Sequence, residues 1–205
     1  MKQIILFPFG ILILFVLVLS LRSQEFTEYK GLKLTPLSQQ RTTYVEQVPE
    51  VNLATYRLKI VGKVKQPLEF KYEEVLAFPQ ESRVITMNCV EGWSYTALWT
   101  GVRISDLLEK GQLMPEAKVV IFHAVGGIYS SALPLEFIKD KKILLAFKIN
   151  NIILPPERGF PFMVGAEGKF GYKWVQWVEK IEASDKDYKG FWETRGYSNE
   201  ADIKK

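Results

Sequence analysis

Short segments in which hydrophobic and polar residues alternate run through the chain from residue 53 onward, a pattern typical of half-buried β-strands. Alternation over residues 53–61 predicts the first strand, and the apolar run 84–88 predicts a second strand that leads directly to Cys89. Residues 119–123 and 129–133 predict a hairpin around Gly126–Gly127. Further strands are expected at residues 143–147 and 174–181.

Three segments instead have the apolar spacing of short helices. They are residues 72–78, before Pro79, residues 104–110, before Gly111, and residues 135–139. Turns are expected at residues 63–67 and 150–151. Many short strands with short helices between them indicate an α+β fold rather than a doubly wound parallel sheet.

The beginning of the chain has a different character. Residues 4–21 are 18 consecutive uncharged residues, a length at the low end for a membrane-spanning helix. We interpret residues 1–21 as a retained transmembrane anchor; a cleaved signal peptide is the alternative, although no small-residue cleavage site follows the run. The polar residues 22–50 predict a tether, and residues 51–200 predict one globular domain.

The charged residues do not fix the membrane orientation, but their distribution argues against nucleic-acid binding. Lys2 precedes the apolar run, whereas Arg22, Lys30 and Lys33 follow it, so the flanking charges do not fix the side on which the domain lies. The net charge of +4 comes from scattered residues, which does not indicate a nucleic-acid surface.

The counts of cysteine and histidine exclude several kinds of site. With one cysteine and one histidine, the chain can form no internal disulfide, CxxC redox pair, structural zinc knuckle or histidine-rich metal site. A Ser-His-Asp triad would have to use His123. That residue lies in the apolar run 119–124, so a core or strand-end position is the interpretation we favour for it.

Cys89 is the residue best placed for chemistry. It ends a predicted strand and is followed by the loop residues Glu91 and Gly92, where a ligand can approach the backbone closely. A thiolate is a soft, strongly donating ligand for redox-active transition metals. A lone cysteine is, however, more often a buried small hydrophobic residue, and this local pattern leaves both interpretations open.

Ordered motifs over about residues 50–200 extend the case. They lie at residues 56–64, at 89–94 followed by 99–102 and 106–108, at 144–154, at 159–161, at 171–181 and at 190–197. In these motifs the chain resembles the molybdopterin-binding domain of the sulfite oxidase superfamily, and in particular small bacterial members similar to the catalytic subunit of a methionine-sulfoxide reductase. The resemblance implies a mixed-sheet α+β domain that binds a molybdenum–molybdopterin cofactor.

The resemblance also implies roles for individual residues. Cys89 is expected to ligate molybdenum beside the pterin dithiolene, Glu91 to face the metal and Tyr129 to lie near the substrate mouth. The residues expected to contact the cofactor are Asn88, Cys89, Trp93, Ser94, Arg158, Gly165, Lys169, Gly171 and Lys173, with the three basic side chains as candidates for holding the phosphate. The alternatives are a solvated loop carboxylate for Glu91, core packing for Trp93 and plain solvation for the lysines.

Some features depart from the family pattern. Phe162 stands where an arginine often follows the Gly-x-Pro motif, and Gln176 stands where a lysine usually precedes tryptophan. A basic, histidine-containing motif is not evident in residues 22–50, and no twin-arginine signal is present. These departures predict a site with fewer cations than is usual in the family.

The principal functional hypothesis is an enzyme. It would perform two-electron oxygen-atom transfer on a small sulfur-containing or similar oxo substrate, exchanging electrons with a membrane haem or quinone-linked partner, since the chain has no second redox centre. Glu91 or Tyr129 would move protons. A non-catalytic membrane-anchored module that keeps the fold for ligand binding or assembly is the second hypothesis, and a metal-free thiol enzyme is the third. The expected location is the cell membrane, with the extracytoplasmic side favoured by the resemblance.

Overall fold

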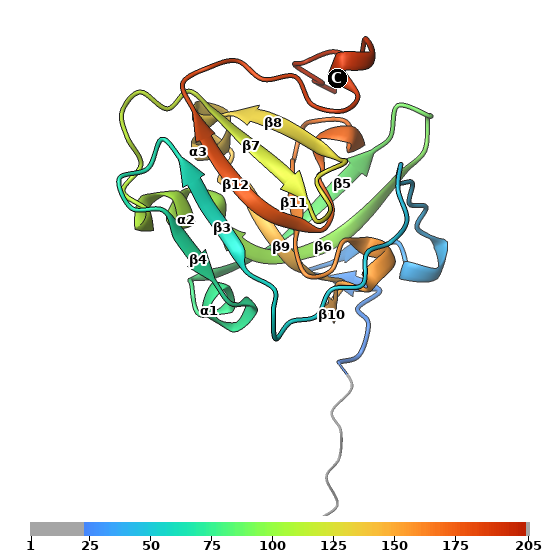
Figure 1. Ribbon diagram of the computed structural model, residues 1–205. Coiled ribbons are helices and arrows are strands. Elements are labelled where there is room, and N and C mark those ends of the chain that lie inside the picture. The colour runs from blue at the N-terminus through green and yellow to red at the C-terminus, as the bar shows by residue number, and fades with distance from the viewer. Residues whose placement is uncertain (1–22, 204–205) are drawn as a thin grey trace, which may run out of the picture.

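The computed structural model describes residues 23–203. Two five-stranded sheets form the framework of this part of the chain (Figure 1). Between residues 23 and 203 no helix is long and apolar enough to cross a membrane. The anchor predicted over residues 1–21 lies outside the described residues.

The first sheet carries Cys89 at the end of a long hairpin. Its strands β5 and β6 pair antiparallel from Gln80↔Val102 to Asn88↔Ser94, so the hairpin turn falls directly after Asn88. The strand order is β10-β9-β6-β5, with β11 also paired to β9. The bounds are β5 Gln80–Asn88, β6 Ser94–Arg103, β9 Leu144–Ile149, β10 Ile152–Ile153 and β11 Met163–Gly165.

The second sheet is mixed. Strand β12 pairs parallel with β3 and antiparallel with β7, in the order β4-β3-β12-β7-β8. The bounds are β3 Leu58–Gly62, β4 Leu68–Phe70, β7 Val119–Ala124, β8 Ser130–Pro134 and β12 Val178–Ser184. Antiparallel hairpins with a single parallel pair confirm the predicted α+β class with a mixed sheet.

Short helices connect the strands. All three predicted helices are confirmed, as α1 Tyr72–Leu76, α2 Ile104–Lys110 and α3 Leu135–Asp140. A small hairpin, β1 Glu28–Tyr29 with β2 Leu32–Lys33, precedes the two sheets. The 3₁₀ turns are η1 Leu37–Gln39, η2 Pro156–Arg158, η3 Gly171–Lys173 and η4 Glu193–Arg195.

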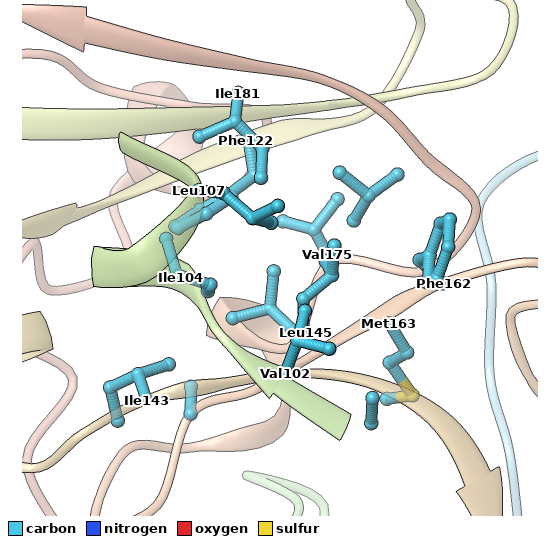
Figure 2. Close-up of a cluster of buried hydrophobic side chains, with 14 of the residues drawn as sticks. Val102, Ile104, Leu107, Phe122, Ile143, Leu145, Phe162, Met163, Val175 and Ile181 are labelled. Atoms are coloured by element: carbon cyan, nitrogen blue, oxygen red, sulfur yellow. The ribbon is translucent and has the colours of Figure 1, made fainter. Parts of the chain in front are cut away.

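The main core lies between the two sheets. Val102 and Leu145 from β6 and β9 gather with Phe122 and Ile181 from β7 and β12, and all four are fully buried (Figure 2). Burying a side chain of this size stabilises the fold by about 1.5–3 kcal/mol. The core therefore fixes the two sheets against each other and holds the end of β5 in place.

Two predicted strands begin later than expected. The strand predicted at 53–61 starts at Leu58, because the Asn52 side chain accepts a hydrogen bond from the backbone N–H of Ala54 and forms a turn. The strand predicted at 174–181 starts at Val178, because Trp177 adopts a positive φ of 52°. Strand β6, which the sequence interpretation did not assign, is buried on both faces over much of its length and so shows little alternation.

Residues 23–50, predicted as a polar tether, are packed against the domain instead. The backbone N–H groups of Phe26 and Thr35 donate to the carbonyls of Asn150 and Thr96 at 2.9 and 2.8 Å. Leu34 is buried. Backbone hydrogen bonding does not depend on side-chain hydrophobicity, which is why a polar segment can be held in this way.

Candidate active site

The turn after β5 presents Cys89. The Cys89 N–H donates to the Trp93 carbonyl at 2.9 Å, and the Gly92 N–H donates to the Cys89 carbonyl at 3.1 Å. Gly92 has φ +88°, which a glycine adopts without strain. The closed turn leaves the Cys89 side chain half-buried rather than sealed in the core.

Cys89 lines a cavity of about 460 Å³. Its walls come from residues 42–46, from the β5–β6 hairpin around Cys89, from Met163, from Gly171, Tyr172, Trp174, Gln176 and Trp177, and from Tyr129, Trp192 and Tyr197. Nine aromatic side chains contribute, so the cavity is apolar over much of its surface. In Figure 1 residues 42–46 lie on the same side of the molecule as the turn between β5 and β6.

Five of the predicted site residues meet at this cavity, namely Cys89, Glu91, Trp93, Tyr129 and Gly171. Gly171 approaches the cysteine closely, since a Cβ added to it would lie 3.1 Å from Met87 Sδ and 3.9 Å from Cys89 Cα. A bridge between Asn88 and Phe170 holds the two segments together. A glycine at position 171 is therefore explained by this close approach, because a larger side chain would crowd Met87 and Cys89.

The Glu91 side chain is turned toward Trp93. Its carboxylate accepts a 2.7 Å hydrogen bond from the Trp93 indole N–H. The Trp93 ring stacks on Tyr95 with an interplanar angle of 9° and has the Arg41 guanidinium 5.6 Å from its centroid. Glu91 is exposed, so it combines a cavity position with access to solvent.

Tyr129 forms the opposite wall. Its hydroxyl donates to the Tyr172 carbonyl at 2.6 Å, and its ring packs against Phe191. Burial, with the nearby Glu193 carboxylate, raises the pKa of the Tyr129 phenol well above its ordinary value. Tyr129 therefore holds its proton and offers a neutral, hydrogen-bonded wall.

The three basic residues predicted to hold phosphate all have protein partners. Lys173 pairs with Glu193 at 2.6 Å, and both side chains are 1% exposed. Lys169 pairs with Asp202 at 2.7 Å and lies over the Phe137 ring. None of the three is among the described residues that line the cavity.

Arg158 is engaged differently, by backbone carbonyls. Its guanidinium donates to the carbonyls of Leu37, Gln40 and Arg41, and its centre lies 5.9 Å from the Tyr95 ring centroid. Burial raises the pKa of Tyr95 to about 12, although Arg158 opposes the shift. Arg158 thus fixes the segment that enters the cavity.

The other predicted cofactor residues, Asn88, Ser94 and Gly165, are not among the described residues that line the cavity. Asn88 donates to the Thr86 carbonyl at 3.3 Å, and Ser94 is exposed at the start of β6. Gly165 is buried in β11 opposite Leu144. Their contacts with the cofactor stay predictions.

The structure also locates the departures from the family pattern. Phe162 is fully buried and packs on the rings of Tyr56 and Tyr72, so this position belongs to the core (Figure 2). Phe162 is not among the described residues that line the cavity, and the expected loss of a cation at the site stays a prediction. Gln176 does line the cavity and donates to the Thr42 hydroxyl at 3.2 Å.

His123 stands apart from the cavity. Its ring nitrogen Nε2 lies 3.0 Å from the Glu182 carboxylate on β12. Burial and Lys180 lower the pKa of His123, and Glu182 only partly opposes them. A cross-strand pair at this position agrees with the predicted strand-end histidine.

Sequence reasoning missed the segment at residues 41–46, here called the strap. Residues 42–46 of the strap line the cavity, and they include Glu46. Burial raises the pKa of the Glu46 carboxyl, offset in part by a hydrogen bond from the Tyr129 backbone N–H. The absence of apolar periodicity hid the strap, and only the isolated acid beside Tyr44–Val45 could have drawn attention to it.

A sheet-dominated α+β domain with one cysteine facing an aromatic cavity fits a known class of oxidoreductase domain. The profile described as "Oxidoreductase molybdopterin binding domain" matches residues 45–192. The chain belongs to this family, and its resemblance to the sulfite oxidase superfamily is confirmed. It is accordingly an oxidoreductase whose domain binds molybdopterin.

Individual relatives agree. The chain is 34% identical over 152 residues to the uncharacterized oxidoreductase YuiH of Bacillus subtilis, covering 74% of this chain and 76% of that one. It is 27% identical over 159 residues to the catalytic subunit MsrP of a protein-methionine-sulfoxide reductase from Campylobacter jejuni, covering 70% of this chain and 54% of the relative.

A solved structure shares the fold. The sulfane dehydrogenase SoxCD from Paracoccus pantotrophus superposes with a TM-score of 0.64 and 27% identity. The match covers 68% of this chain and 40% of that chain. The chain thus spans about half the length of the MsrP relative and less of SoxCD.

The cavity fits a molybdopterin at its cysteine end. It offers one half-buried thiol, a close backbone approach at Gly171 and flat aromatic walls. A carboxylate oxygen of Glu46 is buried without a hydrogen-bond partner among the described residues. The lysines predicted to hold the phosphate are paired within the protein, so hydroxyl and backbone donors that line the cavity, such as those of Thr42 and Thr43, would be needed for the phosphate.

Proposed function

We propose that this chain is a molybdenum-dependent oxidoreductase that reduces a small sulfoxide or a similar oxide by two-electron oxygen-atom transfer. The observation that carries the proposal is the half-buried Cys89 thiol facing an aromatic cavity shared with two carboxyl groups. A cysteine thiolate suits molybdenum, and the family's domain binds the pterin that would accompany it.

The chemistry defines what the protein must supply. Reduction of a sulfoxide breaks the S–O bond, consumes two electrons and two protons, and releases a thioether and water. The bound cofactor supplies the two-electron redox change. We infer that the electrons come from a reduced haem or quinol partner. Among residues 23–203, no group of three or more His, Cys, Asp or Glu side chains is placed to hold a metal ion.

The residues of this chain would hold the cofactor, orient the substrate and move protons. Cys89 would ligate the metal, and Trp93 and Gly171 would lie against the pterin. Glu91, exposed and hydrogen-bonded to Trp93, would take up protons from solvent and pass them to the substrate oxygen. Tyr129 would close the far wall.

The aromatic lining supports a sulfur-containing substrate. Sulfur makes favourable contacts with aromatic rings, worth about 0.3–1.5 kcal/mol each. Four tryptophans and five tyrosines line the cavity, and Tyr44, Val90 and Tyr197 are exposed at it by 38–46%. The name of the MsrP relative, a methionine-sulfoxide reductase subunit, points to the same chemistry.

We further propose that the chain works at a membrane. The support is the uncharged run at residues 4–21, which would place the domain beside a membrane haem or quinol donor. The flanking charges favour neither side of the membrane.

The test is an activity assay in both directions. Protein made in a host that synthesises the cofactor would be offered dimethyl sulfoxide with a reduced viologen dye, and in parallel sulfite with ferricyanide. We expect sulfoxide reduction in the native protein and none in Cys89→Ser. Sulfite oxidation without sulfoxide reduction would overturn the proposed direction, and inactivity of cofactor-loaded protein in both assays would overturn the proposal.

A further inference from the structure

Glu46 is the most unusual polar group in the cavity. Its carboxyl oxygen Oε1 is buried and meets no hydrogen-bond donor among residues 23–203. Burying such an oxygen without a donor is unfavourable, and more so when the group is charged. A side chain kept in that state next to Cys89's cavity is suited to meet a ligand rather than the protein.

The charges around Glu46 have one sign. The cavity has a second carboxylate, Glu91, and no lysine, arginine or histidine among the described residues that line it. Arg41 is a nearby cation that lies over the Trp93 ring, but it is exposed and is not among the described residues that line the cavity. Tyr129 and Tyr172, which face the same space, have raised pKa values and stay neutral.

The carboxyl is held firmly in this place. Arg158 donates to the carbonyls of Leu37 and Gln40, just before the strap, and to that of Arg41, its first residue. Gln176 donates to the Thr42 hydroxyl, and the ring of Tyr44 packs on that of Trp177 with centroids 5.6 Å apart. The strap is therefore fixed at several points, so Glu46 cannot readily turn away from an unfavourable ligand.

We propose that Glu46 is a specificity-determining residue that contacts the substrate and selects neutral or cationic sulfoxides over anionic ones. This inference rests on the proposed function. A like charge brought near a partly buried carboxylate is repelled more strongly than in bulk water, because the effective dielectric constant near a protein surface is about 20 rather than about 80. A neutral sulfoxide escapes that repulsion, and an ammonium group on the substrate would satisfy the buried oxygen.

The test uses three matched aliphatic sulfoxides on the cofactor-loaded full chain. They are neutral dimethyl sulfoxide, anionic methylsulfinylacetate and cationic 2-(methylsulfinyl)ethylammonium. Dissociation constants come from quenching of the cavity tryptophans, and kcat/KM comes from the viologen assay. The variant is Glu46→Gln, which keeps the shape and removes the charge. Glu50→Gln, which changes an exposed carboxylate four residues after Glu46, is the matched control.

For native protein we expect the anion to bind at least about tenfold more weakly than the neutral compound. In Glu46→Gln the anion should gain about tenfold in affinity, the cation should lose affinity, and the neutral compound should change less than about threefold. Glu50→Gln should leave all three unchanged. Near-UV circular dichroism would establish that the variants are folded.

Several results would overturn the inference. The inference fails if native protein binds the three sulfoxides with equal affinity, or if Glu46→Gln changes their three dissociation constants by the same factor. It also fails if the neutral sulfoxide does not bind. If the charge preference appears but none of the sulfoxides is reduced, the proposed function fails and the selectivity of Glu46 stands. If reduction occurs without a charge preference, only the inference about Glu46 fails.

Discussion

The Lys173 ammonium donates to the Glu193 carboxylate at 2.6 Å in the protein interior, where each side chain is 1% exposed. The pair links turn η3, beside the cavity, to turn η4 near the C-terminus. Ser131 on β8 donates to the same carboxylate, and Lys173 also donates to the Ala132 carbonyl at 3.1 Å. Burial lowers the pKa of Lys173, and Glu193 opposes the shift.

This pairing predicts a structural rather than a phosphate-binding role for Lys173. Lys173→Met would leave Glu193 charged and buried, and we expect a loss of about 3–5 kcal/mol in the free energy of unfolding, measured by urea denaturation. Lys173→Met combined with Glu193→Leu removes both charges, so it should lose much less. If the single variant kept its stability but lost pterin, Lys173 would instead be a cofactor ligand.

Arg158 should control the strap. Arg158→Met removes three hydrogen bonds from a charged donor, and we expect a loss of about 1.5–3 kcal/mol in stability. Hydrogen exchange should become faster at residues 37–46 in particular. Arg57→Met is the matched control, since Arg57 donates only to carbonyls of its own segment, Ala54 and Tyr56. Hydrogen exchange that becomes faster equally throughout the chain, or that stays unchanged at residues 37–46, would contradict this role.

The lowered pKa of His123 leads us to expect that the stability of the fold depends on pH. Its folded pKa lies below the ordinary 6.5, so the unfolded chain binds the proton more readily as the pH falls below about 6.5. Native protein should therefore lose stability between pH 7 and pH 5 through this residue, by at most ~1.36 kcal/mol per pH unit. His123→Gln should show a shallower decline in denaturant titrations over that range. A steeper decline would mean that the sign is wrong.

Much of the fold could be predicted from the chain alone, because local patterns decide it. Helices α1, α2 and α3 follow from apolar spacing and from the residues that end them. The start of β12 could not be predicted, because Trp177 takes a left-handed conformation that its surroundings impose. The packing of residues 23–50 depends on backbone hydrogen bonds, which leave no mark in residue type.

The site divides in the same way. Cys89, Glu91, Trp93, Tyr129 and Gly171 could be assigned from ordered motifs, and the fold brings them to one cavity. The partners of Lys169, Lys173 and Arg158 could not, because Asp202, Glu193 and Leu37 are distant in sequence and meet them only in the folded chain. Glu46 was missed for the same reason.

We propose that Cys89 holds molybdenum. The direct measurement is the molybdenum and pterin content of purified protein, by elemental analysis and by fluorescence of the oxidised pterin, for native protein, Cys89→Ser and the exposed control Glu50→Gln. We predict molybdenum in near-equal amount to protein in the native and control chains, with molybdenum strongly reduced in a folded Cys89→Ser. Native protein without molybdenum, or a Cys89→Ser variant that retains it in full, would show that Cys89 does not hold the metal.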